Sequence, residues 1–297
     1  MRVFVTGASG FVGSAVVNEL LTHGHQVTGL VRSETGADSL AETGAEVVRG
    51  TIEDLDLLRA EAAKADGVIH TAFNHDFSKF AENCEVDRRA IEALGSALES
   101  SDRPLLTTSG MAHLAQGRLA TEDDTPPPPS AHFPRASEAA TAAVAARGVK
   151  ATVVRLAPSV HGEGDHGFVP ILIRIAREKG RSAYIGEGTN RWPGVHRLDA
   201  ARLYRLALEN GAAGGPFHAA AEEGVSFKEI ATIIGRRLDL PVVSLTPEEA
   251  ADHFGWFRIF APLDAPASST RTRATLGWEP QGPGLIEDIE KAGYFVG

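Results

Sequence analysis

The chain has 297 residues, of which 43% are hydrophobic, and its 29 basic and 39 acidic side chains give a formal net charge of −10. This length is enough for one large or two small domains, and the hydrophobic content is that of a folded protein rather than a disordered one. The acidic balance disfavours binding to nucleic acid, which needs a basic surface. The single cysteine excludes a disulfide scaffold and a cysteine-rich zinc site.

No run of 18 uncharged apolar residues exists, and the apolar stretch at the N-terminus is too short for a signal peptide. We therefore expect a cytoplasmic protein without a membrane segment. Asp165 and His166 form the one pair that suggests a metal, but no HExxH-like spacing accompanies them, so we expect no metal site.

Short apolar runs alternate with helical patterns through the first half of the chain. The runs lie at residues 3–5, 26–31, 46–48, 67–70, 105–108 and 151–156, and helical spacing covers residues 11–22, 54–65 and 78–98. The runs are continuously apolar, as in strands that are buried on both faces. This alternation predicts an α/β fold, a Rossmann-type doubly wound parallel sheet with helices on both faces.

The composition changes after Pro158. Four prolines at 126–129 predict an exposed loop inside the first domain, because a helical pattern resumes at 135–146. Beyond residue 160 glycine, histidine and tryptophan become frequent, and helical patterns return at 198–208, 226–238 and 247–254. We predict a first domain at residues 1–160 and a smaller C-terminal α/β domain at 161–297. A strand near 216–220 is expected to return to the main sheet.

The strongest local motif is the glycine-rich segment that follows the first strand. It consists of Thr6, Gly7, Ala8, Ser9, Gly10, Phe11, Val12 and Gly13. Gly7 permits a tight turn, Gly10 lets a pyrophosphate approach the backbone, and Gly13 lets the helix pack closely on the strand. The helix N-terminus then offers free N–H groups to the phosphates. The motif predicts a dinucleotide-binding domain; the alternative is a purely structural turn.

The second strand ends at Val31, Arg32 and Ser33, where such domains read the adenosine ribose. An acidic residue there favours a free 2′-hydroxyl, whereas an arginine can fork onto a 2′-phosphate. We therefore predict NADP(H) as the cofactor; the alternative for Arg32 is a solvated surface position.

The TGxxGxxG spacing resembles the short-chain dehydrogenase/reductase superfamily, and further motifs resemble its extended, epimerase/dehydratase-like branch. These motifs lie at residues 68–72, 106–109, 155–162, 195–199 and 276–280. The third-strand motif departs from the family pattern, because Thr51 follows Gly50 where an aspartate is usual. The resemblance implies further cofactor contacts from Thr51, Ile52, Thr71, Ala72, Phe73, Thr107, Pro158 and Val160.

The resemblance fails at the family's catalytic Tyr-x-x-x-Lys. On the best alignment Phe133 stands at the tyrosine position and Ser137 at the lysine position. The chain has three tyrosines, Tyr184, Tyr204 and Tyr294, and none is followed by lysine four residues later. The departure therefore does not depend on the alignment, and phenylalanine has no proton to donate.

Other polar residues must then provide the chemistry, if any occurs. The resemblance assigns the catalytic serine to Ser109, and we predict His132 and His161 as alternative proton donors, because histidine titrates near neutral pH. Arg135 could partly replace the charge of the lysine. Each has a plainer alternative, such as a capping serine or a solvated histidine. Predicted substrate contacts are Asn74, His75, Met111, Phe133, His166, Trp192 and His196.

These observations predict an NADP(H)-dependent oxidoreductase acting on a small carbonyl, imine or activated alkene. Two alternatives remain: a non-catalytic NADP(H)-binding sensor or regulatory protein, and a sugar-nucleotide epimerase or dehydratase. The resemblance implies a homodimer formed through the helices at 78–98 and 135–146.

Overall fold

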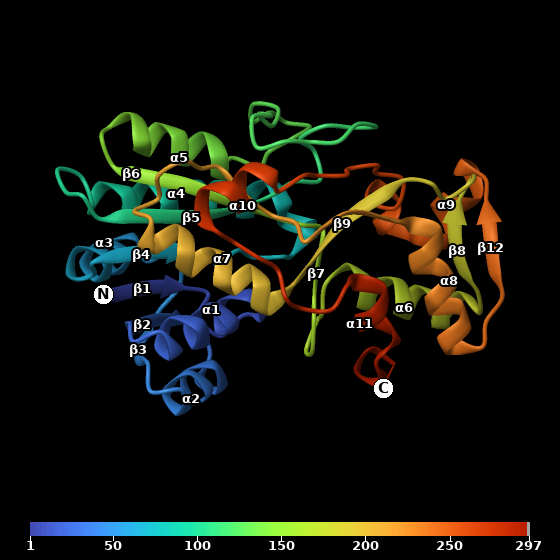
Figure 1. Cartoon of the computed structure of the whole chain (residues 1–297), viewed down its shortest axis with the longest axis horizontal. Coiled ribbons are helices and arrows are strands. Elements are labelled where there is room, and N and C mark those ends of the chain that lie inside the picture. Colours follow the sequence, from blue (N-terminus) through green and yellow to red (C-terminus); the bar gives the residue numbers. More distant parts are fainter. Residues whose placement is uncertain (296–297) are drawn as a thin grey trace.

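The centre of the molecule is a seven-stranded parallel sheet (Figure 1). The computed structural model describes residues 1–295. The strands follow the order β10-β6-β5-β4-β1-β2-β3. Their bounds are β1 (Arg2–Thr6), β2 (Gln26–Val31), β3 (Glu46–Arg49), β4 (Gly67–His70), β5 (Pro104–Gly110), β6 (Lys150–Leu156) and β10 (Phe217–Ala219). The predicted α/β, Rossmann-type fold is confirmed, and β10 pairs with β6 at the edge of this sheet.

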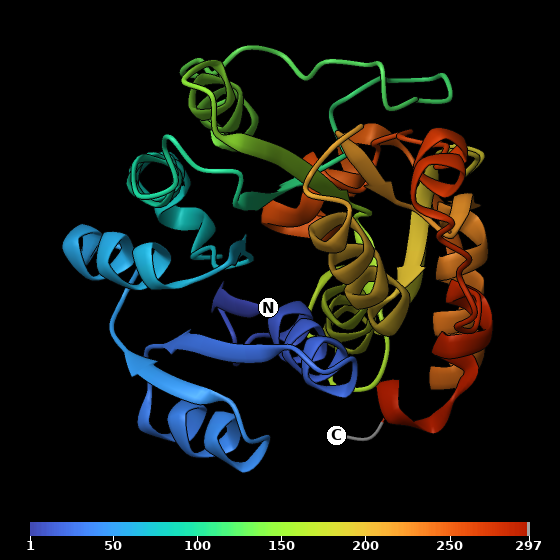
Figure 2. The ribbon, with the colours of Figure 1, turned by 60° about the vertical axis from the view of Figure 1, so that its left-hand side comes forward.

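Helices cover both faces of the sheet (Figure 2). One face carries α1 (Phe11–Thr22), α2 (Glu34–Glu42) and α7 (Arg197–Glu209), and the other carries α3 (Leu55–Lys64), α4 (Phe80–Ser96) and α5 (Ser137–Ala146). Successive strand residues point to opposite faces. In β1, Val3 and Val5 therefore pack under α1, whereas Phe4 packs with the α3–α4 layer.

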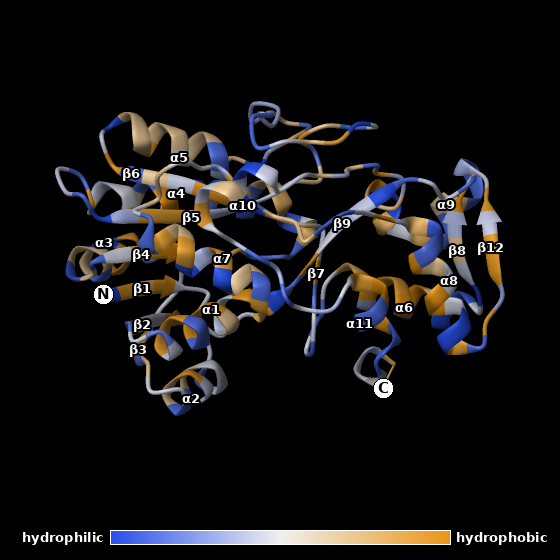
Figure 3. Cartoon of the chain, in the orientation of Figure 1, coloured by the Kyte–Doolittle hydropathy of each residue, from blue (hydrophilic) through white to orange (hydrophobic). Residues whose placement is uncertain are grey.

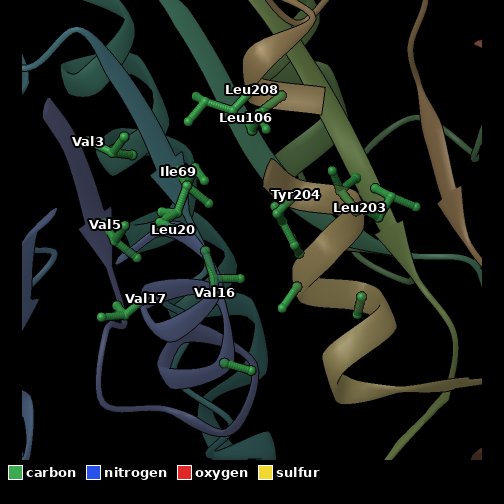
Figure 4. Close-up of a cluster of buried hydrophobic side chains, with 14 of the residues drawn as sticks. Val3, Val5, Val16, Val17, Leu20, Ile69, Leu106, Leu203, Tyr204 and Leu208 are labelled. Atoms are coloured by element: carbon green, nitrogen blue, oxygen red, sulfur yellow. The ribbon is translucent and has the colours of Figure 1, made fainter. Parts of the chain in front are cut away.

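The α1–α7 layer is held by a dense apolar cluster (Figure 4). The cluster includes four fully buried side chains: Val16 and Leu20 of α1, and Leu203 and Tyr204 of α7. Full burial of one such aliphatic side chain contributes roughly 1.5–3 kcal/mol. This packing holds the first residue of α7, Arg197, beside the first residue of α1, Phe11.

A second lobe follows beyond the carboxyl ends of the strands (Figure 1). It contains a sheet in the order β11-β9-β7 and a two-stranded sheet of β12 and β8. The strands are β7 (Ser159–His161), β8 (Ser182–Ile185), β9 (Arg191–His196), β11 (Glu222–Ser226) and β12 (Val242–Leu245). Its helices are α6 (Phe168–Lys179), α8 (Phe227–Leu238), α9 (Pro247–Phe254) and α11 (Leu285–Glu290), with 3₁₀ turns η2 (Gly255–Ile259) and η3 (Ala292–Tyr294). The short α10 (Thr270–Leu276) packs against α7 and β10 of the main sheet, and the 3₁₀ turn η1 (Phe77–Lys79) directly precedes α4.

Apolar residues follow the strands of the main sheet and the inward faces of its helices, and polar residues mark the loops (Figure 3). The proline-rich segment at 126–129 lies in the long connection between β5 and α5, without helix or strand. Within residues 1–295 no helix has the length and apolar character needed to cross a membrane.

Candidate functional site

The glycine-rich turn joins β1 to α1 at the carboxyl edge of the sheet. Gly7 has φ +69, and a Cβ there would lie 2.8 Å from the backbone nitrogen of Ala72. A Cβ on Gly13 would overlap the carbonyl oxygen of Gly7. Gly10 precedes α1 with no side chain capping the helix, and the first turn of α1 carries no acidic residue. The turn thus leaves room and free N–H groups for a dinucleotide pyrophosphate.

Thr6, Thr71 and Ala72 support this turn from behind. The Thr71 hydroxyl donates to the carbonyl oxygen of Thr6 at 2.7 Å, and the backbone N–H of Ala72 points to Thr6 Oγ1 at 3.4 Å. These contacts tie the end of β1 to the end of β4, so the loop after β4 follows the glycine turn along the same edge.

A cleft of about 290 Å³ lies between the glycine turn and α2. Six of its ten lining residues carry hydroxyl groups and none is acidic: Ser9, Ser14, Ser33, Thr35, Ser39 and Thr43. Ser33 caps α2 by accepting a hydrogen bond from the N–H of Gly36. Arg32 is exposed beside this cleft, and within residues 1–295 no carboxylate forms an ion pair with it. The neighbouring Glu34 is paired with Arg49.

The remaining predicted cofactor contacts lie in the segments that follow β3 and β6, and on β5. Thr51 and Ile52 are half-buried directly after β3. Pro158 and Val160 are half-buried around the start of β7, and Val160 packs against the α1–α7 core. Thr107 is fully buried and hydrogen-bonded to Thr141 of α5 at 2.7 Å, so its side chain lies beneath the surface.

Ser109 faces the start of α5. Because strand residues alternate, Ser109 shares the α5-facing side of β5 with Thr107. It is 6% exposed, and in the described part of the chain its hydroxyl has no hydrogen-bond partner. A polar group in this position can bind a substrate oxygen without first breaking a protein contact.

Arg135 brings a positive charge to the same place. Its guanidinium carbon lies 3.9 Å from the centre of the Phe73 ring, and Nη2 donates to the carbonyl oxygen of Thr108 at 3.3 Å. Its Nε donates to the Ser137 hydroxyl at 2.7 Å. The fork is therefore fixed by stacking and by two hydrogen bonds, one of them to Thr108, the residue before Ser109.

A buried hydrogen-bonded chain holds Ser137 from below. The Ser137 hydroxyl donates to Asp87 of α4 at 2.5 Å, and His70 Nε2 donates to the other Asp87 oxygen at 3.1 Å. His70 Nδ1 is bonded to Thr6 Oγ1 at 2.7 Å. Burial alone would raise the pKa of Asp87, but the hydrogen bonds and charges of these neighbours and of Arg135 hold that pKa below its ordinary value. Asp87 is thus an ionised anchor beneath the site.

Histidines from both lobes lie near the carboxyl edge of the main sheet. His75 lies edge-on to Phe73 at 5.2 Å, and His166 lies edge-on to Phe11 at 5.7 Å. The His75 side chain is exposed at the surface, and its partial loss of water together with the positive charges of Arg135 and His166 lowers its pKa. His113, which the sequence reasoning missed, lies 5.3 Å from the ring of Phe133, and burial lowers its pKa as well.

The other predicted site residues lie in different surroundings. His132 is exposed in the long loop, and Asn74 is exposed after β4. His161 is 1% exposed and its Nδ1 is bonded to Asp288 of α11 at 2.9 Å, while His196 caps the start of α7 through Leu198. These two histidine rings are 5.6 Å apart, on the α11 side of the second lobe.

Two of the predicted substrate contacts are core residues. Trp192 is 1% exposed and its ring packs edge-on against Phe227 at 5.0 Å, inside the second lobe. Met111 is 0% exposed in a small cluster with Leu114 and Ala120. Trp192 was expected to form an apolar wall of the site, but in the structure both side chains fill a core.

The sequence did not reveal the roles of Asp87, His70 and Arg197, although His70 and Arg197 lie within the motif segments at 68–72 and 195–199. A histidine at the end of the otherwise apolar β4 was one sign of a buried network, whereas Asp87 is one of several polar residues in α4. Among residues 1–295 no group of three or more histidine, cysteine or acidic side chains is arranged to hold a metal ion.

Comparison with known proteins places this site in a family. Residues 3–220 match the NAD dependent epimerase/dehydratase family. The chain is 52% identical to an uncharacterized protein of Schizosaccharomyces pombe over 99% of this chain and 100% of that one. It is 45% identical to an uncharacterized protein of Saccharomyces cerevisiae over 100% of both.

More distant relatives have described activities. The chain is 28% identical to a 4-hydroxy-2-methyl-3-oxo-4-farnesyl-3,4-dihydroquinoline-1-oxide ketoreductase of Stigmatella aurantiaca, over 90% of this chain and 84% of that one. A solved dTDP-glucose 4,6-dehydratase of Streptomyces venezuelae, with NAD bound, superposes with a TM-score of 0.76 at 22% identity, over 97% of this chain and 96% of that one. With its parallel sheet, its glycine turn and the match over residues 3–220, the chain belongs to the NAD dependent epimerase/dehydratase family.

Proposed function

We propose that this protein is an NADP(H)-dependent reductase of a small carbonyl, imine or activated alkene. Two observations carry the proposal: the Ser109 hydroxyl at the end of β5 has no partner in the described chain, and the Arg135 guanidinium is fixed on the carbonyl oxygen of the preceding residue, Thr108. The ketoreductase relative from Stigmatella aurantiaca gives the same class of reaction.

NADP(H) is the proposed cofactor, because the residues at the ribose end favour a phosphate. Arg32 has no carboxylate partner in the described chain, and the adjoining cleft is lined by hydroxyl groups without an acidic residue. A carboxylate there would favour a free 2′-hydroxyl instead. When bound, the nicotinamide would supply the hydride for the reduction.

The protein's own groups would stabilise the charge that develops on the substrate oxygen. The Ser109 hydroxyl donates a hydrogen bond to that oxygen, and Arg135 places a positive charge next to it. Because Asp87 is ionised and buried, it keeps Ser137 and Arg135 in this arrangement. Arg135 thus supplies the cation that the family's lysine would supply at position 137.

A histidine would then supply the proton that the missing tyrosine supplies elsewhere in the superfamily. Among the histidines near this edge of the sheet, His75 contacts the Phe73 ring on which Arg135 is stacked, so we assign it this role. Its lowered pKa makes the proposal testable, because the reduction should slow as the pH rises through a pKa below 6.5. His132 and His161 stay as predicted alternatives.

The test is NADPH oxidation by the pure protein against a panel of aldehydes, ketones, imines and activated alkenes. We expect turnover with some members, a loss of about 10²-fold or more in S109A, and no loss in S244A, a matched exposed serine on β12. H75Q should lower kcat more than H132Q or H161Q. Tight NADPH binding without any oxidation would favour the sensor alternative, and turnover of UDP- or dTDP-sugars would favour the epimerase or dehydratase.

The homodimer remains part of the proposal. The helices α4 and α5 expected to form it pack side by side on one face of the sheet. Sedimentation of the pure protein at micromolar concentration gives the oligomeric state directly.

A further inference from the structure

Arg197 is a half-buried cation with a buried Nε, in a position that is unfavourable without an anion. It is the first residue of α7, and its guanidinium carbon lies 4.8 Å from the ring centre of Phe11, the first residue of α1. A helix N-terminus carries a partial positive charge, so cations are normally found at the opposite end. Arg197 instead stands beside the positive ends of two helices.

The protein gives this guanidinium only neutral partners. Nη1 donates to the carbonyl oxygen of Glu163 at 2.7 Å, and Nη2 donates to Ser14 Oγ at 3.2 Å. Its Nε is buried and has no hydrogen-bond partner, and within residues 1–295 no carboxylate lies within 4 Å of it. Burial lowers the pKa of Arg197, and the charge of Glu163, which acts in the opposite direction, does not offset this loss of water.

The chain also holds Arg197 in a defined place. Gly162 has φ +140, and a Cβ at this position would lie 3.0 Å from Cγ of Arg197. The turn at 162–164 therefore fits around the arginine stem, while Ser14 and Phe11 fix its head against the first turn of α1. A loosely held surface arginine would need no such fit.

We infer that Arg197 binds the pyrophosphate of the dinucleotide together with the free N–H groups at the start of α1. This inference rests on the proposed cofactor, and it assigns a residue outside the glycine turn to the phosphates. A diphosphate on the glycine turn would lie against the same helical turn as the guanidinium and would supply the missing negative charge. Arginine suits this role, because its fork can meet two phosphate oxygens at once.

Three ligands separate the phosphate positions. NADPH and ADP-ribose both contain the pyrophosphate, whereas 2′-AMP contains only the 2′-phosphate that Arg32 is proposed to bind. Dissociation constants are measured by calorimetry for the wild type, R197Q, R197K and R174Q. Arg174 is the matched control, because it is exposed on α6 and pairs only with Glu178.

We expect R197Q to weaken the binding of NADPH and of ADP-ribose by about 10- to 100-fold. The dissociation constant of 2′-AMP should stay within about twofold of the wild-type value. R197K keeps the charge but not the fork, so it should fall between the two, and R174Q should match the wild type. Thermal unfolding of each variant without ligand checks that the fold is intact. A lower midpoint in R197Q with unchanged ADP-ribose affinity would mean that Arg197 only ties α7 to α1.

Each outcome decides one of the two proposals. Unchanged NADPH and ADP-ribose affinity in R197Q, or an equal loss for all three ligands, would overturn the role of Arg197 while leaving the cofactor assignment in place. A wild-type chain that binds none of the three ligands would overturn the cofactor proposal, and the role of Arg197 with it.

Discussion

The glycine turn and the start of α5 lie at the same edge of the sheet but follow different rules. In the turn, Gly7 and Gly13 are required by contact, because a Cβ at either position would strike the backbone. At the start of α5, Arg135 carries the charge, and the alignment proposed from the sequence puts Phe133 and Ser137 at the tyrosine and lysine positions of the superfamily. Steric requirements leave no substitute for glycine, whereas charge and hydrogen bonding can be supplied from a neighbouring position.

The largest expected effect comes from breaking the turn. In G13A the added Cβ strikes Gly7, and we expect a loss of about 3 kcal/mol in the free energy of unfolding, measured in urea, with loss of NADPH binding. In the control G10A the nearest atom to the new Cβ is the Gly7 oxygen at 3.2 Å, so stability should change little while NADPH affinity falls. Equal stability losses in the two variants would contradict the steric account.

The next effect tests whether the charge at the start of α5 is functional. R135Q should lower kcat/KM for a reduced substrate by about 10²- to 10³-fold, because the developing charge on the substrate oxygen loses its cation. R147Q is the control, since Arg147 lies just beyond the end of α5 and pairs with exposed Glu99. Steady-state kinetics on both variants measure this difference, and an R135Q enzyme as active as R147Q would remove Arg135 from the mechanism.

A third prediction separates the pH dependence of the fold from that of the chemistry. Burial lowers the pKa of His218 to about 4, and Nε2 of this ring faces the guanidinium of Arg155 at 3.1 Å. Between pH 6.5 and pH 4 the unfolded chain binds the extra proton, so stability falls as the pH falls, by about 3 kcal/mol between pH 7 and pH 4. Urea unfolding at several pH values should show this slope, and H218N should reduce it.

The smallest effect concerns cofactor choice. R32Q should weaken the binding of NADPH by about 10- to 100-fold and leave the binding of NADH unchanged, because only NADPH has the 2′-phosphate that Arg32 is proposed to bind. R49Q is the control, since Arg49 lies close by but pairs with Glu34. Fluorescence titration of both cofactors gives the ratio, and a wild-type chain that prefers NADH would reverse the assignment.

The first half of the fold was predictable because its strands are continuous apolar runs that pair with neighbours along the chain. The helix at 11–22 was placed to the residue, and the helix at 78–98 begins as the 3₁₀ turn at Phe77–Lys79 before α4. The helix α2 was missed, because its polar residues outweigh the periodicity of Ala37 and Leu40. The second lobe was harder, because its short strands pair across long separations, as β8 does with β12.

The same limit applies to the site. The glycine turn and Arg32 could be predicted, because each consists of residues that are adjacent in the sequence. The chain from Thr6 through His70 and Asp87 to Ser137 joins residues up to 64 positions apart, so only the folded topology brings it together. The burial of Trp192 and Met111 could not be foreseen for the same reason, because burial depends on partners that the local pattern does not contain.

The central claim is that this chain transfers hydride without the tyrosine of its superfamily. NADPH carrying deuterium at both positions of C4 of the nicotinamide, incubated with wild type and with the S109A variant, tests it directly by mass spectrometry of the product. We predict one deuterium in the reduced product of the wild type and a rate at least about 10²-fold lower in S109A. Tightly bound NADPH with no deuterium in any product would contradict the claim.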